Sequence, residues 1–170
     1  MEIFKNLSGR FTKGVVNSRL LVIVHHTASG SASLNAILRF FRMSEAVSIH
    51  YVVGKQGEVV QMVPEDKVAW HVGVSEFGQM KDLNRCSIGI EVLSSGKDYT
   101  DAQRVAVWEL CRDIMSRNKI PPYKVLRHAD VARPIGRKSD VDPEFHKPWG
   151  SWGKFQSALS WKSPFSNLPK

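Results

Sequence analysis

The order of hydrophobic patterns in this sequence predicts a single α/β domain, in which a mixed central sheet is flanked by helices. The patterns run strand, helix, hairpin, strand, helix, strand and helix, as expected when helices cover one sheet. The most apolar stretch, LLVIV at 20–24, is too short for a helix and is typical of a strand buried on both faces. The 170 residues suffice for one full core, and they contain no internal repeat, low-complexity segment or linker.

The two ends of the chain are expected to lie outside the folded domain, which we place at residues 20–161. Residues 1–19 are polar and basic, so we expect a loosely ordered lead-in, and residues 162–170 are expected to form a frayed tail. The N-terminus lacks the apolar core of a signal peptide, and no stretch approaches the roughly 20 apolar residues that cross a bilayer. We therefore expect cytoplasmic synthesis without a signal peptide, and no membrane partner.

A helix followed by a hairpin is predicted after the first strand. Ser31 or Ser33 can cap the helix, whose apolar stripe is expected to face the core. The stripe has the spacing i, i+3, i+4 and i+7: Leu34, Ile37, Leu38 and Phe41. Two strands follow at 48–53 and 58–63, and the glycine-containing turn between them predicts an antiparallel hairpin.

A long loop and a strand with a buried acid come next. Residues 64–86 show no clear period and carry Trp70 and His71, and a loop of this length in a compact domain usually binds a ligand. The strand predicted at 87–95 is apolar except for Glu91 and its terminal serines. A carboxylate in such a strand is costly to bury, so Glu91 needs either a partner or a role.

The second helix has a clear start and a clear end. Thr100 and Gln103 have the spacing of a capping box, and the helix is predicted to run to about Asn118, before two prolines. Cys111 lies on its apolar face and is expected to be a small core residue. Cys86 and Cys111 do not form a CxxC pair, so no cysteine site is predicted.

The last part of the domain is predicted to be mostly loop. A short strand at 124–127 delivers His128 to its end, and residues 129–149 show little periodicity. A final helix is predicted at 151–161, with aromatic residues on its buried side.

The charge of the chain points to a polyanionic partner. The net charge is +8 and the isoelectric point is near 9.7. Nucleic acid and a bacterial wall rich in phosphate and carboxylate both fit this charge. The chain lacks the stacked aromatic pattern of a single-strand binding platform, so we expect no nucleic-acid partner.

Two histidine-bearing strands and the acids of a nearby loop can together form a zinc site. His25 and His26 end the first strand, where neighbouring side chains point to opposite sides, so one of the pair can face a cleft. His128 ends a later strand. The acids in the loop after it are Asp130, Asp140 and Asp142. Two histidines and one carboxylate would leave the fourth position of a catalytic zinc ion free for water.

Five motifs resemble the type 2 N-acetylmuramoyl-L-alanine amidases, a family that includes phage lysins, wall-recycling amidases and animal peptidoglycan recognition proteins. In chain order they are IVHHTAS, SIHYVVGKQGEVVQMVPE, VAWHVG, LNRCSIGIE and LRHADVARPIGRKSDVDP. The resemblance extends from about residue 20 to 149. It implies a zinc amidase fold, one zinc ion per chain, and hydrolysis of the amide bond between N-acetylmuramic acid and L-alanine.

The resemblance also implies a set of zinc ligands. The family's first two ligands match His25 and His128, and its third, a Cys or Asp directly before a proline, matches Asp142. A second rule conflicts with this choice: a Lys of the family, matched by Lys138 and able to stabilise the oxyanion, usually lies two residues before the third ligand, which would select Asp140. We expect Asp142, because a proline restricts the backbone of the residue before it.

Glu91 is the expected general base. It resembles the acid that takes the proton from water in the wall-recycling branch of the family, and burial would raise its pKa toward neutrality, as that role requires. The alternative is a buried ion pair with Arg127 or Arg85. Some phage lysins carry a Tyr where this chain has Ile49, so Glu91 is expected to be the sole acid–base residue.

The resemblance assigns further residues to the surroundings of the zinc. The expected substrate-groove residues are Trp70, His71, Asn84 and His50. Asn84 is expected to hold the groove loop and His26 to be structural. His50 is expected either to be structural or to orient the base or the water.

The expected partner is peptidoglycan or a muropeptide, bound by a monomer. The basic charge and the lack of an added wall-binding domain favour a phage-type lysin over an amidase that recycles soluble muropeptides. A peptidoglycan-binding module without activity is the remaining alternative, and it is disfavoured because all three ligand types are present.

Overall fold

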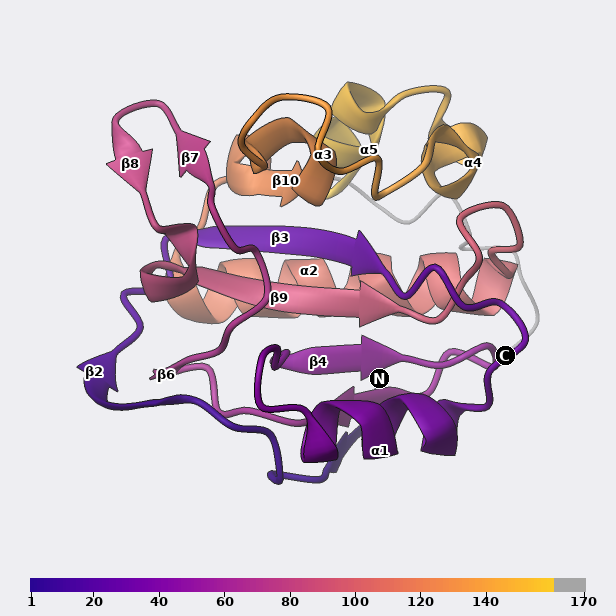
Figure 1. The fold of residues 1–170 in the computed structure, drawn as a ribbon. Helices are drawn as coiled ribbons and strands as arrows, with labels where there is room; N and C mark the ends of the chain where they lie inside the picture. The colour runs from indigo at the N-terminus through magenta and orange to yellow at the C-terminus, as the bar shows by residue number, and fades with distance from the viewer. Residues whose placement is uncertain (161–170) are drawn as a thin grey trace.

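The computed structural model describes residues 1–160 and contains a six-stranded mixed sheet (Figure 1). In spatial order the strands are β1 (Ile3–Lys5), β5 (Val59–Gln61), β4 (Tyr51–Val53), β9 (Ser87–Val92), β3 (Leu21–His26) and β10 (Val125–Arg127). Neighbouring strands are parallel except for β4 and β5, which form the predicted antiparallel hairpin. The predicted α/β class with a mixed sheet is confirmed. The predicted tail at 162–170, like residue 161, lies outside the described residues.

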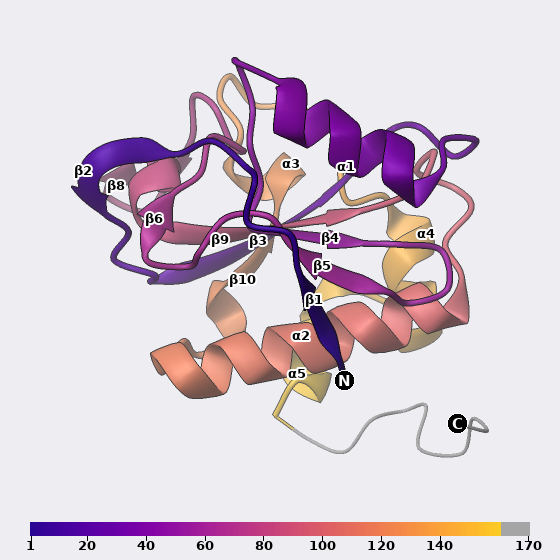
Figure 2. The same cartoon turned by 90° about the horizontal axis from the view of Figure 1, so that it is seen from below.

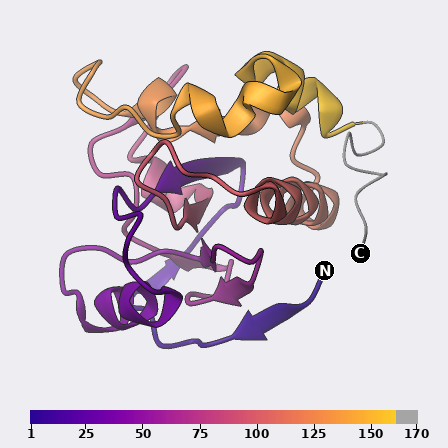
Figure 3. The same ribbon diagram turned by 90° about the vertical axis from the view of Figure 1, so that its right-hand side faces the viewer.

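Helices cover both faces of this sheet. Helix α2 (Asp101–Asn118) lies on one face and α1 (Leu34–Met43) on the other, as the view from below in Figure 2 shows. The short helix α5 (Trp152–Ala158) packs on the α2 side, and Figure 3 shows the resulting layers from the end of the molecule. Strand β3 is enclosed by α2 and α5 on one face and by residues of the 64–86 loop on the other, and the side chains of residues 21–24 are fully buried.

Successive side chains of β3 point to opposite faces of the sheet and belong to two separate hydrophobic cores. Val22 and Val24 belong to the large core under α2 and α5, whereas Leu21 and Ile23 face the opposite side and pack with residues of the 64–86 loop. His25 continues the second set, because it follows Leu21 and Ile23 with a period of two. The alternation therefore carries His25 onto the face of the sheet that α2 does not cover.

Both long helices begin at the caps that the sequence predicts. The Ser33 side chain accepts a hydrogen bond from the N–H of Ala36 and starts α1. At α2, Thr100 Oγ1 accepts from the N–H of Gln103 at 3.1 Å, and Gln103 Oε1 accepts from the N–H of Thr100 at 3.1 Å. This is the reciprocal capping box.

Replacing Thr100 with Ala is expected to destabilise the fold by about 1 kcal/mol, because the first turn of α2 loses its side-chain acceptor. The free energy of unfolding from urea titration would measure the loss. Thr100→Ser keeps the hydroxyl group and is the matched control. Equal stability of the Ala variant and the wild type would contradict the capping role.

The N-terminal segment is not the loose lead-in that the sequence suggested. Strand β1 pairs in parallel with β5 at the edge of the main sheet, and β2 (Thr12–Val16) pairs with β6 (Lys67–Val68) in a separate two-stranded sheet. Both strands leave most of their side chains partly or fully exposed. Their pairing rests on backbone hydrogen bonds, which a hydrophobic pattern does not record.

The two long loops also contain short elements. Strands β7 (Glu76–Phe77) and β8 (Met80–Lys81) form a small hairpin inside residues 64–86. Helices α3 (His128–Val131) and α4 (Pro143–His146) lie in the segment that the sequence left as loop. Helices of four residues are too short to produce a recognisable apolar period. The last helix, α5, is shorter than the predicted 151–161, and Ser151 is its N-cap.

Within residues 1–160, none of the helices combines the length and the apolar character that crossing a bilayer requires.

Candidate metal centre

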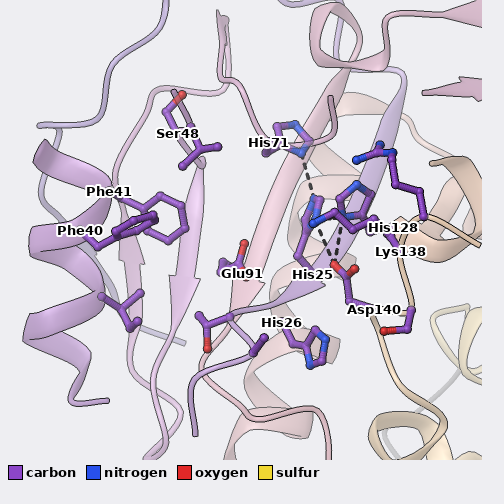
Figure 4. A pocket seen from close by; sticks show the side chains of 16 residues that line it. His25, His26, Phe40, Phe41, Ser48, His71, Glu91, His128, Lys138 and Asp140 are labelled. Atoms are coloured by element: carbon purple, nitrogen blue, oxygen red, sulfur yellow. Dashed lines mark hydrogen bonds and ion pairs between the residues drawn. The ribbon is translucent and has the colours of Figure 1, made fainter. Parts of the chain in front are cut away.

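Three side chains from separate segments meet at the carboxyl ends of β3 and β10. His25 lies near the end of β3, His128 directly follows β10, and these two strands are parallel neighbours. Asp140 comes from the loop between α3 and α4. The Nδ1 atoms of the two histidines are 2.9 Å apart, and Asp140 Oδ2 lies 3.0 Å from that of His128 and 3.4 Å from that of His25 (Figure 4).

The third member of this cluster is Asp140 and not the expected Asp142. The carboxylate of Asp142 accepts a hydrogen bond from the N–H of Glu144 at 3.0 Å and caps α4, with Pro143 in the first turn. An Asp before a Pro is a common start of a helix, which explains the Asp-Pro motif without a metal. Asp130, the remaining candidate, pairs with Arg127. The geometry therefore favours the spacing rule that counts from Lys138.

The protonation of His128 leaves one nitrogen available as a ligand. Its Nε2 atom lies 3.2 Å from the carbonyl oxygen of Val72, and since a carbonyl oxygen only accepts, this nitrogen carries the hydrogen. The lone pair of His128 is then on Nδ1, which faces Asp140 and His25. Such a contact from the outer nitrogen of a histidine is typical of metal-binding histidines.

The charge states also suit a cation. Burial lowers the pKa of His25 to about 4, against the opposing effect of its contact with Asp140. Although burial raises the pKa of Asp140, its contacts with His128 and His25 hold that pKa well below the usual range. Neutral imidazole and ionised carboxylate are the forms that bind a metal.

The three ligand atoms pass a simple test of fit for zinc. Their separations of 2.9, 3.0 and 3.4 Å bracket the distance between neighbouring ligands of a tetrahedral zinc ion, which is about 3.3 Å for bonds of about 2.0–2.1 Å. The residues that can hold a metal ion are thus His25, His128 and Asp140, and all three are buried. Three protein ligands leave the fourth position of zinc free.

Glu91 lies beside this cluster because of the strand register. Glu91 of β9 is the direct neighbour of His25 in β3, so both side chains emerge on the same face of the sheet. The side chain is only 9% exposed and points into the same cavity as the three ligands (Figure 4). Burial, with a smaller contribution from the charge of Asp140, raises the pKa of Glu91 to about 8. Such a pKa suits a group that exchanges protons near neutral pH.

The alternative role of Glu91, a buried ion pair, is not what the structure contains. Arg127 is bound to Asp130, and among residues 1–160 no salt bridge joins Glu91 to Arg85 or to another basic side chain. In the described part of the chain, its carboxylate lies in the cavity and takes part in none of the salt bridges.

The cavity around these groups has a volume of about 360 Å³. One side is formed by the metal cluster, Glu91 and Lys138, and the other by Phe40 and Phe41 of α1. Lys138 lies two residues before Asp140, so the spacing that is usual in the family is present. The sequence pattern did not indicate this wall: Phe41 belongs to the apolar stripe of α1, which predicted only a core contact, and Phe40 lies outside the stripe.

Three of the four residues expected to line a groove, Trp70, His71 and Asn84, lie around one hollow, and only His50 lies apart from them. Trp70 and Asn84 border a second hollow that adjoins the metal cluster, and Asn84 Oδ1 accepts from the N–H groups of His71 and Val72 at 2.9 and 3.0 Å. Asn84 thus holds the loop, as expected. His50 does not fit the groove: it is fully buried.

Both nitrogens of His50 are occupied by the backbone. Its Nδ1 accepts from the N–H of Gly89 at 3.0 Å, and its Nε2 lies 3.0 Å from the carbonyl oxygen of Lys67. A histidine used in this way ties strands together and cannot reach a substrate. These contacts favour the structural alternative for His50 over a contact with substrate. His26 is half-buried at the rim of the cavity.

Comparison with known proteins agrees with this geometry. Residues 17–144 match the family model described as N-acetylmuramoyl-L-alanine amidase. The chain belongs to this amidase family. The predicted resemblance, which rested on five motifs, is confirmed.

Two curated relatives from Escherichia coli (strain K12) resemble much of this amidase-family chain. The N-acetylmuramoyl-L-alanine amidase AmiD is 35% identical over 147 residues, which cover 76% of this chain and 50% of AmiD. The 1,6-anhydro-N-acetylmuramyl-L-alanine amidase AmpD is 36% identical over 117 residues, which cover 67% of this chain and 59% of AmpD. The chain thus spans only 50–59% of the length of these relatives.

The fold is likewise similar to a solved amidase. The structure of AmiD from E. coli, in complex with the substrate anhydro-N-acetylmuramic acid-L-Ala-D-gamma-Glu-L-Lys, has a TM-score of 0.70 at 30% identity. The match covers 86% of this chain and 60% of that one.

Proposed function

We propose that this domain hydrolyses the amide bond between the lactyl group of N-acetylmuramic acid and L-alanine, with one zinc ion as its cofactor. The observation that carries the proposal is the meeting of His25, His128 and Asp140 in one cavity with Glu91. Without Glu91 beside it, the cluster of three ligands would give no reason to prefer a catalytic metal site to a structural one. Every group comes from a single chain, in line with the monomer that we expect.

Two related structures support a muropeptide as the bound group. AmiD from E. coli is solved with an anhydromuramoyl tripeptide substrate, and AmpDh3 from Pseudomonas aeruginosa with an anhydromuramic pentapeptide. The second is 26% identical to this chain, with a TM-score of 0.67. The same class of ligand is therefore proposed for the cavity between the metal cluster and α1.

The residues of the cavity have different roles in the proposed reaction. When bound, zinc lowers the pKa of a water molecule toward about 7 and polarises the amide carbonyl group. Glu91 accepts a proton from the attacking water and returns it to the nitrogen of the leaving L-alanine. Lys138 stabilises the negative charge that develops on the carbonyl oxygen. Phe40 and Phe41 form an apolar wall opposite these groups and reduce access of bulk water.

Removing the metal is expected to abolish hydrolysis, because the proposed reaction depends on zinc to activate water and to polarise the amide carbonyl group. Adding zinc is expected to restore the activity. The measurement is the clearing of a turbid suspension of purified cell wall, with mass analysis of the products for peptides that begin with free L-alanine. Full activity of protein that contains far less than one zinc ion per chain would exclude the proposal.

Replacing Lys138 with Met is expected to lower kcat by about 100-fold and to change KM little, because the charge acts on the transition state more than on the bound substrate. Lys138→Arg keeps a cation and should retain more activity. A Met variant with the kcat of the wild type would place Lys138 outside the reaction.

We further propose the intact wall as the natural substrate, as for a phage-type lysin. The net charge of +8 supports this choice, since it attracts a polyanionic wall. The similarity to AmpD favours the alternative, a recycling amidase that acts on soluble anhydromuropeptides. Comparing kcat/KM for sacculi and for a soluble anhydromuropeptide separates the two. A strong preference for the soluble substrate would favour recycling.

A further inference from the structure

His71 borders both the cavity of the metal cluster and the adjoining hollow, and its two ring nitrogens contact His25 and Ser87. Nδ1 of His71 lies 3.0 Å from Nε2 of His25, and this contact is drawn in Figure 4. On its other side, Nε2 of His71 lies 3.2 Å from Oγ of Ser87. His71 therefore bridges a metal ligand and the first residue of β9.

The carbonyl oxygen of Leu83 determines which atom donates in each hydrogen bond of the series that links Leu83, Ser87, His71 and His25. The Ser87 hydroxyl donates to the carbonyl oxygen of Leu83 at 2.6 Å, and that oxygen can only accept. The hydrogen of Ser87 is thus used, so Oγ accepts from Nε2–H of His71. Nδ1 of His71 is then unprotonated and accepts from Nε2–H of His25.

This sequence of contacts determines which nitrogen of His25 is free. With the hydrogen on Nε2, the lone pair of His25 lies on Nδ1, the atom 2.9 Å from Nδ1 of His128 and 3.4 Å from Asp140. His128 has the same form, because its own Nε2 lies 3.2 Å from a carbonyl oxygen. Three atoms with lone pairs then face one another, an arrangement that a cation stabilises.

The structure also provides a place for the His71 ring. A Cβ atom added to Gly89 would lie 2.6 Å from Nδ1 of His71 and 2.7 Å from its Cγ, so the ring packs directly on the backbone of β9. Glycine inside a strand often marks such a close approach. The carboxamide of Asn84 holds the backbone of His71 from the other side.

One face of β9 contributes three residues to the surroundings of the metal cluster. Ser87, Gly89 and Glu91 alternate along β9 with apolar residues and emerge on the same side of the sheet. Ser87 binds the outer nitrogen of His71, Gly89 makes room for its ring, and Glu91 lies beside His25.

We infer that His71 is a positioning residue for the metal centre: with Ser87 and the carbonyl group of Leu83, it holds the ring of His25 in the orientation and tautomer that place Nδ1 toward the metal. This inference rests on the metal centre of the proposed function and is independent of which substrate is cut. Partners of this kind typically contribute 10–100-fold to metal affinity.

The test compares two substitutions, each of which places a polar group near the position of a different ring nitrogen of His71. His71→Asn retains an acceptor near the position of Nδ1, whereas His71→Gln reaches toward Ser87 but lacks that acceptor. We expect zinc to bind about 10–100-fold more weakly to the Gln variant, and the Asn variant to recover most of the loss. Ser87→Ala, which leaves His71 in place but releases its outer nitrogen, should weaken binding by about 10-fold.

Zinc affinity is measured by competition with a chromophoric chelator, and the ligand geometry by the visible absorption spectrum of the cobalt-loaded protein. His26→Gln is the matched control: His26 is adjacent to His25 and borders the same cavity, but it has no contact with His71 among the hydrogen bonds of the described residues, so affinity and spectrum should not change. Far-UV circular dichroism checks that each variant is folded.

Wild-type affinity and an unchanged cobalt spectrum in folded His71→Gln would overturn the inference, and a raised KM in that variant would return His71 to the substrate groove. The zinc affinity and the cobalt spectrum are measured without substrate, so a failure of the amidase assignment leaves these two readouts unaffected. A wild-type protein that takes up neither zinc nor cobalt would overturn the metal centre and this inference together.

Discussion

Glu91→Gln is expected to bind zinc normally and to lose at least about 100-fold in kcat, because the substitution keeps the shape of the side chain and removes the base. The structure gives two reasons for this size of effect. Glu91 is the neighbour of His25 across the β3–β9 pair, and its carboxylate lies in the same cavity as Lys138. Initial rates on a soluble muropeptide and zinc content per chain are the two measurements.

The same variant has a second expected property that separates catalysis from folding. Burial raises the pKa of Glu91 to about 8, above the value of about 4.3 for a free glutamate. A carboxyl group whose pKa is raised by folding contributes stability at low pH, and this is lost as the pH rises through about 8. Glutamine does not ionise, so metal-free Glu91→Gln should be more stable than the metal-free wild type at pH 9 but not at pH 4.

Thermal unfolding of both metal-free proteins at the two pH values measures this difference. A variant that is inactive and also less stable at pH 9 would indicate a damaged fold and not a missing base. Wild-type turnover in a folded, zinc-loaded variant would move the base to another residue. His50 is then a poor candidate, because the backbone occupies both of its nitrogens.

The sequence was most informative where one side-chain period extends over a whole element. The run LLVIV predicts β3, the i, i+3, i+4, i+7 stripe predicts α1, and the capping box predicts the start of α2. Each of these signals arises from burial or from local hydrogen bonding, so it is contained in a short stretch of residues.

The sequence was least informative for β1 and for the short helices α3 and α4. β1 joins the sheet through backbone contacts with residues 59–61, more than 50 positions away in the chain. No side-chain pattern of three residues encodes such a pairing. The four-residue helices are similarly held by their ends and by tertiary contacts, and not by an apolar stripe.

Part of the site was visible in the sequence but was not used. The motif SIGIE alternates Ser87, Gly89 and Glu91 with two isoleucines, and a period of two in a strand separates two faces. Because the segment is apolar overall, its single acid is more conspicuous than the face that these three residues share. Their partner His71 lies 16 positions before Ser87, so the contact itself could not be inferred from spacing.

The third ligand is the point at which the structure departs most from the expectation, since Asp140 and not Asp142 lies in the cluster, and it leads to the second large prediction. Asp140→Ala is expected to lose zinc and activity together, because its carboxylate is the charged member of the cluster, at 3.0 Å from Nδ1 of His128. The loss of zinc affinity should exceed the 10–100-fold that removal of an outer partner costs. Zinc content after dialysis and the rate on purified wall measure the two effects.

Asp142→Ala is the matched control, since it removes a carboxylate two positions away in the same loop. Its side chain caps α4 through the N–H of Glu144, so the variant should lose about 1 kcal/mol of stability but keep its zinc and most of its activity. Asp142→Asn, which can still cap the helix, should also recover the stability. If Asp142→Ala lost zinc while Asp140→Ala retained it, the proline rule would be correct, and Lys138 would lie too far along the loop from the third ligand to act in the way proposed.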